Sequence, residues 1–187
     1  MAPHFLLLAK SGAFFYIKGG EILLKDIMPE SLIMEITLEG KQSAKAEKLV
    51  DYLFKEIIDK NGESYLDHLY SVARNFQDEM RYSIGLLHDV LEDTKITAND
   101  LAVLGFRESY IEAVILLTKL ENESYDEYIK RLILSNNSVA LDIKLADLTH
   151  NMNEERLSKL SIDSREKLLK KYIPAKIKIE ERRKELW

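Results

Sequence analysis

The sequence contains no cysteine and only three prolines and seven glycines among its 187 residues. Without cysteine the chain forms neither disulfides nor thiolate metal sites, so any metal ion must be held by nitrogen and oxygen ligands. The scarcity of proline and glycine favours a helix-rich domain. The apolar run Phe5–Ala9 is too short to cross a membrane, and no Lys or Arg precedes it. We therefore expect neither a membrane span nor a secretory signal, and a cytoplasmic protein.

The charge balance is mildly acidic, with 27 Lys and Arg against 32 Asp and Glu and a formal net charge of −5. Such a chain is a poor candidate for binding through phosphate contacts, so we expect no nucleic-acid partner. Hydrophobic residues make up 46% of the sequence, which at this length is enough for one domain with a sizeable core.

The first 40 residues differ in pattern from the rest of the chain. Gly19-Gly20 stands between apolar runs and predicts a hairpin turn. Because the segment is strongly apolar, it must bury that face on the domain or on a second subunit of a homo-oligomer. We predict a β-like N-terminal extension over residues 1–40 and a helical domain over residues 41–187. The runs with β-like character lie at residues 5–8, 13–17, 22–24 and 32–38.

From about residue 42 the apolar residues follow helical spacing. Thr97 and the capping box Ser124-x-x-Glu127 mark helix starts, Gly105 marks a helix end, and Pro174 is expected to kink or split the last helix. The fold class predicted for this domain is all-α. The expected helices cover about 42–61, 64–72, 81–91, 97–105, 108–120, 124–135, 138–153 and 165–185.

Four polar side chains interrupt the apolar stretch Leu86–Thr94: His88, Asp89, Glu92 and Asp93. If the stretch is one helix, these residues share one side of it. A histidine and three carboxylates crowded together repel one another unless a cation lies among them, and divalent ions accept such mixed ligands. The pattern predicts a metal site with a second pair of carboxylates beside it, as in a hydrolase.

Two further segments complete the predicted site. His68 lies near the start of one expected helix and Asp147 lies on another, so three helices supply two imidazoles and two carboxylates to one ion. This ligand set leaves coordination positions open for water and substrate, as a catalytic site requires. Asn151 follows Asp147 by one helical turn and is expected to face the same cleft.

These segments resemble the HD-domain phosphohydrolases, and within them the RelA/SpoT-type hydrolases of guanosine tetraphosphate. The resemblance rests on His68, Leu86–Thr94 (LLHDVLEDT), Leu117–Lys119 and Lys144–Asn151 (KLADLTHN), and it spans roughly residues 45–180. It implies an all-helical HD-domain fold and hydrolysis of the 3′-pyrophosphate of guanosine-3′,5′-bis(diphosphate).

The resemblance also implies roles for individual residues. His68, His88, Asp89 and Asp147 would ligate a manganese ion, Glu92 and Asp93 would orient or deprotonate the attacking water, and Asn151 would contact the nucleotide. From their charge alone, Lys60, Lys119 and Lys144 are candidates to screen the pyrophosphate. His150 is expected to be structural and hydrogen-bonded near the site, with a ligand role as the alternative. Tyr65, Tyr125, Tyr128 and Tyr172 are expected to pack in the core or at its rim, with stacking of one of them on a base as the alternative.

The sequence departs from the long bifunctional enzymes at two places. Their Arg-Lys pair before the first metal-binding histidine, whose arginine packs on guanine, is Asp59-Lys60 here, and a carboxylate cannot replace that cation–π face. Their Arg-Thr after Asn151 is Asn153-Glu154. Two alternatives to the guanosine substrate therefore stay open. One is the same catalyst acting on a deoxynucleotide, a 3′-phosphorylated adenine nucleotide or NADPH, and the other is a nucleotide sensor without turnover. We expect no synthetase domain in a chain of this length.

Overall fold

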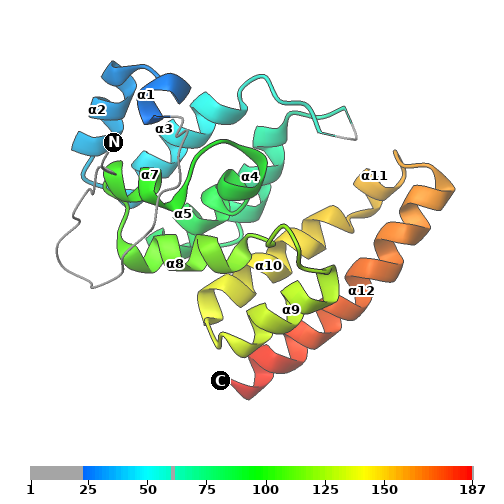
Figure 1. Ribbon diagram of the computed structural model, residues 1–187. Helices are drawn as coiled ribbons and strands as arrows, with labels where there is room; N and C mark the ends of the chain where they lie inside the picture. The colour runs from blue at the N-terminus through cyan, green and yellow to red at the C-terminus, as the bar shows by residue number, and fades with distance from the viewer. Residues whose placement is uncertain (1–22, 60–61, 187) are drawn as a thin grey trace.

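The computed structural model describes residues 23–59 and 62–186, and this part of the chain is helical, with one isolated β-bridge between Ile58 and Ser64 and no extended strand (Figure 1). The prediction of an all-α fold is confirmed. In chain order the helices are α1 (Leu24–Ile27), α2 (Glu30–Leu38), α3 (Gln42–Phe54), α4 (Tyr65–Ala73), α5 (Glu79–Leu87), α6 (Val90–Asp93), α7 (Ala98–Val103), α8 (Glu108–Leu117), α9 (Tyr125–Leu134), α10 (Ser138–Asn151), α11 (Glu154–Leu157) and α12 (Ile162–Glu185).

The predicted β-like character of residues 32–38 is wrong, because these residues form most of α2, and Leu24 of the run 22–24 belongs to α1. Pro29 caps α2 at its start, where a missing N–H costs nothing. Ile36 is fully buried, whereas Met34 and Leu38, two residues away on either side, are 59% and 77% exposed. A strand with period two would bury all three on one face, so this burial pattern is helical. The runs at 5–8 and 13–17 and the Gly19-Gly20 hairpin lie outside the described residues, and the boundary at residue 40 stays a prediction.

The stretch predicted as one helix over 81–91 is two helices. Helix α5 ends at Leu87 and α6 begins at Val90, with His88 and Asp89 between them. The backbone of Asp89 has φ −103° and ψ 0°, in the sparsely populated bridge region where many active-site residues lie. The four polar residues therefore do not share one face of a single helix, and the chain turns at the metal motif.

The other helix limits follow their sequence signals more closely. Thr97 and Ser124 both form capping boxes, and Gly105 ends the segment after α7 with a φ of +80°. Helix α3 ends at Phe54, earlier than predicted, and α12 starts at Ile162 and runs through Pro174 without being split. Pro174 is exposed, so water can reach the backbone groups that its ring leaves unbonded.

Helix α5 lies at the centre of the fold and packs against α3, α4, α8 and α10, while α12 lies along α9 and α10 (Figure 1). Gly85 on α5 permits the closest of these contacts. A Cβ atom at Gly85 would lie 2.8 Å from the Cα atom of Ala73 on α4, closer than any side chain tolerates. The missing side chain lets α4 and α5 cross closely, which brings His68 of α4 beside His88 at the end of α5.

Two buried charged groups fasten the outer helices to this centre. The Lys45 Nζ atom donates hydrogen bonds to the carbonyl oxygens of Ile36, Thr37 and Leu104, at 2.7, 2.8 and 2.9 Å, and so holds the C-terminal ends of α2 and α7. The buried carboxylate of Asp142 on α10 pairs with Arg81 of α5 and Arg183 of α12. Among the described helices, not one combines the length and the hydrophobicity that a membrane crossing needs.

Candidate metal centre

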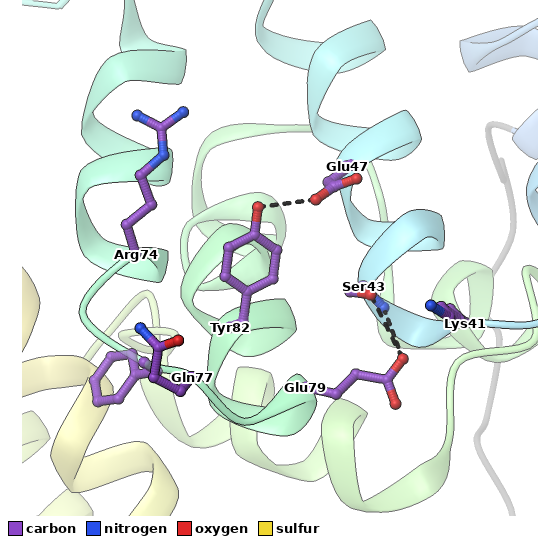
Figure 2. Close-up of a pocket in the computed structure, with 8 residues that line it drawn as sticks. Lys41, Ser43, Glu47, Arg74, Gln77, Glu79 and Tyr82 are labelled. Carbon is purple, nitrogen blue, oxygen red and sulfur yellow. Dashed lines mark hydrogen bonds between the residues drawn. The ribbon is translucent and has the colours of Figure 1, made fainter.

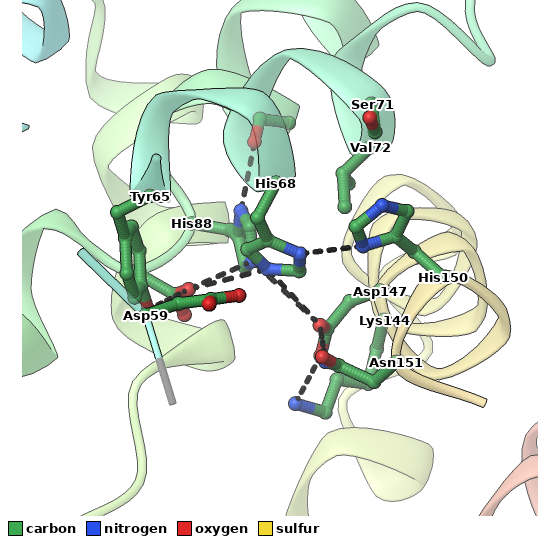
Figure 3. A network of polar contacts seen from close by, with 12 residues as sticks. Asp59, Tyr65, His68, Ser71, Val72, His88, Lys144, Asp147, His150 and Asn151 are labelled. Atoms are coloured by element: carbon green, nitrogen blue, oxygen red, sulfur yellow. Dashed lines mark hydrogen bonds and ion pairs between the residues drawn. The ribbon is translucent and has the colours of Figure 1, made fainter. Parts of the chain in front are cut away.

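The structure brings His68, His88, Asp89 and Asp147 together at one point, where α4, the α5–α6 turn and α10 meet. Figure 3 shows His68, His88 and Asp147 of this group. The Nε2 atoms of the two histidines lie 3.3 Å apart. Asp89 Oδ2 lies 3.1 Å from Nε2 of His88 and 3.6 Å from Nε2 of His68. Asp147 Oδ1 approaches the same two nitrogens at 3.9 and 3.5 Å. One imidazole nitrogen from each histidine and one oxygen from each aspartate thus converge.

The hydrogen bonds on the far side of each ring decide which nitrogen faces the centre. His88 Nδ1 lies 2.7 Å from the carbonyl oxygen of Gly85, which can only accept, so Nδ1 carries the proton and Nε2 of the neutral ring is left with its lone pair. His68 Nδ1 lies 2.8 Å from Nδ1 of His150. Metal-binding histidines usually fix their orientation through such a bond at the second ring nitrogen. Both rings therefore turn Nε2 toward the centre, the orientation that the predicted ligand role requires.

The ionisation of the group fits a cation site. Burial lowers the pKa of His88, but the carboxylates of Asp89 and Asp147 outweigh it and raise the pKa to about 9. Burial raises the pKa of Asp89, but His88 and His68 hold it well below its usual range. Without a metal ion, part of the negative charge of Asp89 and Asp147 is balanced by a proton on His88. A divalent ion would supply the same balance, and two imidazoles with two carboxylates are a donor set that such ions accept.

The second oxygen of Asp147 is held from outside the centre. Lys144 Nζ donates to Asp147 Oδ2 at 2.7 Å, and the amide of Asn151 donates to Oδ1 at 2.6 Å. Lys144 also lies 5.3 Å from the centroid of the Tyr128 ring. Burial lowers the pKa of Lys144, but Asp147 outweighs it and keeps the lysine charged. Of the residues predicted as substrate contacts, Lys144 and Asn151 therefore lie at the centre and orient the carboxylate of Asp147, while their contact with substrate stays a prediction.

The predicted water-activating pair lies on α6, at the exposed edge of the centre. Asp93 accepts a hydrogen bond from the hydroxyl of Tyr65, which also donates to Asp89 Oδ2 at 2.8 Å. Glu92 instead accepts from the backbone N–H of Lys119 at 3.1 Å, and so turns toward the segment after α8. The Lys119 Nζ atom is bound to the carbonyl oxygens of Leu120 and Glu123, and Lys60 lies outside the described residues.

One residue of this centre, Tyr65, was not predicted as part of it. Tyr65, expected to pack in the core or at its rim, instead joins two carboxylates of the centre. Its spacing of three residues before His68 places both on one face of α4, which is the signal in the sequence that could have found it. His150 holds the ring of His68, which confirms the prediction that it is structural and hydrogen-bonded near the site, and it follows Asp147 by three residues on α10. The sequence motif alone does not predict which side chains Tyr65 and His150 contact.

Beside the centre, Asp59 forms an ion pair at 2.6 Å with Arg156 of α11, which also pairs with Glu63 at 3.1 Å. The position that carries arginine in the long bifunctional enzymes is thus occupied here by a carboxylate that already has a cationic partner. Figure 3 shows Asp59 beside Tyr65 at the edge of the centre.

A separate hollow of about 610 Å³ lies between α3, the end of α4 and the start of α5 (Figure 2). Two pairs of its polar residues are bound to each other. The hydroxyl of Tyr82 donates to Glu47 at 2.8 Å, and Ser43 lies within hydrogen-bond distance of Glu79. Arg74 lies over the ring of Tyr70, 5.1 Å from its centroid. The residues that line this hollow include no histidine, so it does not offer the mixed imidazole and carboxylate set of the metal centre. We therefore place the candidate functional site at the metal centre.

No family model matches the sequence. The chain is 36% identical over 108 residues to a probable guanosine-3′,5′-bis(diphosphate) 3′-pyrophosphohydrolase of Synechocystis sp., over 50% of this chain and 14% of the relative. It is 35% identical over 111 residues to a GTP pyrophosphokinase of Myxococcus xanthus, again over 50% of this chain and 14% of that protein. The chain therefore spans a small part of the length of these two relatives, whose names describe opposite reactions.

A solved structure of a metazoan orthologue of SpoT, a protein that hydrolyses ppGpp and plays a role in starvation responses, has the same fold. The TM-score is 0.55 at 21% identity, and the match covers 85% of this chain and 95% of that one. This confirms the expected all-α fold of the HD-domain type. The likeness in structure extends over nearly the whole of that chain, whereas the matches in sequence are to part of much longer proteins.

Proposed function

We propose, from the homology of this chain to SpoT/RelA-type ppGpp 3′-pyrophosphohydrolases, that it is a metal-dependent hydrolase of phosphorylated nucleotides. The leading substrate is guanosine-3′,5′-bis(diphosphate), cleaved at its 3′-pyrophosphate. The observation that carries the proposal is the convergence of His68, His88, Asp89 and Asp147, with Asp93 linked to the group through Tyr65.

In the proposed reaction, the residues of the centre have separate tasks. His68, His88, Asp89 and Asp147 would hold the divalent ion, which when bound lowers the pKa of a water molecule and neutralises charge on the phosphate. Asp93 and Glu92 lie at the exposed edge, where a carboxylate can accept the proton of the attacking water. Asn151 and Lys144 lie against Asp147. They keep that carboxylate in place, and an amide and an ammonium at this position suit the oxygens of a phosphorylated nucleotide.

Manganese is the metal we propose, since oxygen and imidazole ligands without thiolate suit it, with open positions for water and substrate. The names of the two relatives favour neither hydrolysis nor synthesis. The carboxylates at Glu92 and Asp93 favour a hydrolase over a nucleotide sensor that binds without turnover. A pair of residues that activates water serves no purpose in such a sensor. The cytoplasmic location and the absence of a nucleic-acid partner stay predictions.

A second substrate class is supported by the ion pair of Asp59 with Arg156. An arginine at position 59 could pack its flat guanidinium on guanine, but a carboxylate cannot, and this one is already bound to Arg156. The same catalyst acting on a deoxynucleotide, a 3′-phosphorylated adenine nucleotide or NADPH therefore stays the alternative.

The test is to incubate the Mn²⁺-loaded protein with a panel of these nucleotides and to separate the products. We expect guanosine-3′,5′-bis(diphosphate) to give GDP and pyrophosphate, with EDTA abolishing the reaction. Faster turnover of another nucleotide would support the proposed hydrolase but identify that nucleotide as its substrate. Tight binding without turnover of any nucleotide in the panel would reject the enzyme and support the sensor.

A further inference from the structure

The Tyr65 hydroxyl connects the two functional parts of the metal centre. It lies 2.8 Å from Asp89 Oδ2 and also donates to Asp93 Oδ2. Asp89 Oδ2 is the oxygen that faces the Nε2 atoms of His68 and His88. The hydroxyl thus lies between a proposed ligand oxygen and a proposed proton acceptor.

We propose that Tyr65 is a positioning residue that holds the Asp93 carboxylate in register with the metal ligands. This inference rests on the proposed function, since it deepens the role given there to Asp93. Tyr65 does not touch the reacting atoms in this account. It acts through Asp93, whose orientation it fixes.

Asp93 needs such a restraint because of where it lies. It is the last residue of α6, a helix of four residues, and its side chain is exposed. An exposed aspartate on so short a helix loses rotamer freedom only if a partner holds it. General-base catalysis depends on placing the acceptor within hydrogen-bond reach of the proton it removes. A misplacement of about 1 Å can cost on the order of 100-fold in rate.

Tyr65 is itself held rigidly, so it can serve as a reference point for Asp93. Its ring stacks on Phe54 of α3, with centroids 5.1 Å apart and planes inclined by 14°. Phe54 is fully buried. The ring also packs edge-on against His68, 5.7 Å between centroids. These ring contacts do not involve the hydroxyl, so Tyr65→Phe removes the link to Asp93 and leaves the packing in place.

A phenol has one proton and here faces two acceptors, so it donates fully to one carboxylate at a time. An Asp89 oxygen that binds a cation has less electron density to offer a donor. In the loaded protein we therefore expect the Tyr65 proton to favour Asp93. In the metal-loaded centre the hydroxyl would therefore hold Asp93, which is a different function from packing in the core.

The experiment compares Tyr65→Phe with Tyr70→Phe in the full chain. Tyr70 is the matched control because it lies on the same helix and its hydroxyl donates to a carboxylate, Asp51 at 2.9 Å, away from the centre. We expect Tyr65→Phe to lower kcat roughly 10- to 100-fold while KM and Mn²⁺ affinity stay within about 3-fold. Tyr70→Phe should change none of these. An unchanged kcat in Tyr65→Phe would overturn the inference, as would an equal loss in Tyr70→Phe.

A double-mutant cycle with Asp93→Asn separates action through Asp93 from action through Asp89. If Tyr65 acts through Asp93, Tyr65→Phe should lower kcat less than about 2-fold in the Asp93→Asn background. A full additional loss in that background would overturn the inference while leaving the proposed hydrolase intact.

Crystal structures of the Mn²⁺-loaded protein and its Tyr65→Phe variant provide a readout that needs no turnover. We expect the Asp93 carboxylate to stay on the Tyr65 hydroxyl in the first and to leave that position in the second. An Asp93 that keeps its position in Tyr65→Phe would overturn the inference. If the unaltered protein turns over no nucleotide, the proposed function fails, and these structures still decide whether Tyr65 positions Asp93.

Discussion

The Nδ1 atom of His68 lies 2.8 Å from the Nδ1 atom of His150, so one proton is shared between two imidazole nitrogens. Burial and the neighbouring His68 lower the pKa of His150 to about 4. His150 is therefore neutral at neutral pH, and its Nδ1 can accept a hydrogen bond from the Nδ1–H of His68. This leaves Nε2 of His68 free to face the centre, and it gives His150 a function in preparing a ligand.

Replacing His150 tests this relationship. We expect His150→Phe to lower Mn²⁺ affinity roughly 10- to 100-fold, the range found when the outer partner of a metal-binding histidine is removed. His150→Gln should retain more affinity, because its amide oxygen can accept the same bond. The control is Thr149→Ala, at the exposed neighbouring position. The Mn²⁺ affinity of each variant is measured by calorimetry. Equal affinities for His150→Phe and the control would contradict the assignment.

Asp147 and Lys144 allow metal binding and stability to be tested separately. Asp147→Ala removes a proposed ligand and also leaves the largely buried Lys144 ammonium without its partner, so we expect metal binding to be lost and stability to fall by about 3–5 kcal/mol. Adding Lys144→Met should recover much of the stability, as measured by urea unfolding, but none of the metal binding. Full Mn²⁺ occupancy in either variant would reject Asp147 as a ligand.

Metal affinity should depend on pH through His88. In the metal-free protein its pKa is raised to about 9, so at pH 7 a proton occupies the ring that must become neutral to bind a metal. Mn²⁺ binding then releases that proton, and we expect affinity to rise by about 10-fold per pH unit between pH 7 and 9 and to level off above it. Calorimetry in buffers of different ionisation enthalpy counts the released protons. An affinity that is flat over this range would show that His88 is already neutral.

Gly85 controls the distance between the two histidines. Gly85→Ala would place a Cβ atom 2.8 Å from the Cα atom of Ala73, and the backbone of α4 must move to relieve it. We expect a loss of stability of roughly 1–3 kcal/mol and weaker Mn²⁺ binding, since His68 moves with α4. Gly40→Ala is the matched control, because nothing lies within 4 Å of its added Cβ. Unchanged stability and affinity in Gly85→Ala would show that the crossing of α4 and α5 is loose.

The sequence predicts the parts of this structure that depend on local signals. The capping residues Thr97 and Ser124 and the glycine at position 105 mark helix limits that the structure confirms. The motif residues His88 and Asp89 could be recognised, but not the chain turn between α5 and α6, because apolar spacing looks the same in one long helix and two short ones. Residues 32–38 read as a strand because they are rich in isoleucine and leucine, and only their burial pattern reveals α2.

Contacts between helices could not be predicted in this way. Tyr65 and His150 gain their roles from the crossing of α4 with the α5–α6 turn and with α10, and this crossing depends on the absence of a side chain at Gly85. The pairing of Asp59 with Arg156 joins residues far apart in the chain and is equally invisible in the pattern of either segment.

The central claim, that a metal centre with a water-activating carboxylate pair hydrolyses a nucleotide pyrophosphate, is tested most directly with the variant Glu92→Gln/Asp93→Asn. The measurement is the rate of pyrophosphate release from guanosine-3′,5′-bis(diphosphate) at saturating Mn²⁺, in this variant and in the unaltered protein. We expect the variant to bind Mn²⁺ within about 3-fold of normal and to release pyrophosphate roughly 10²- to 10⁴-fold more slowly. A variant that turns over at a near-normal rate would contradict the account.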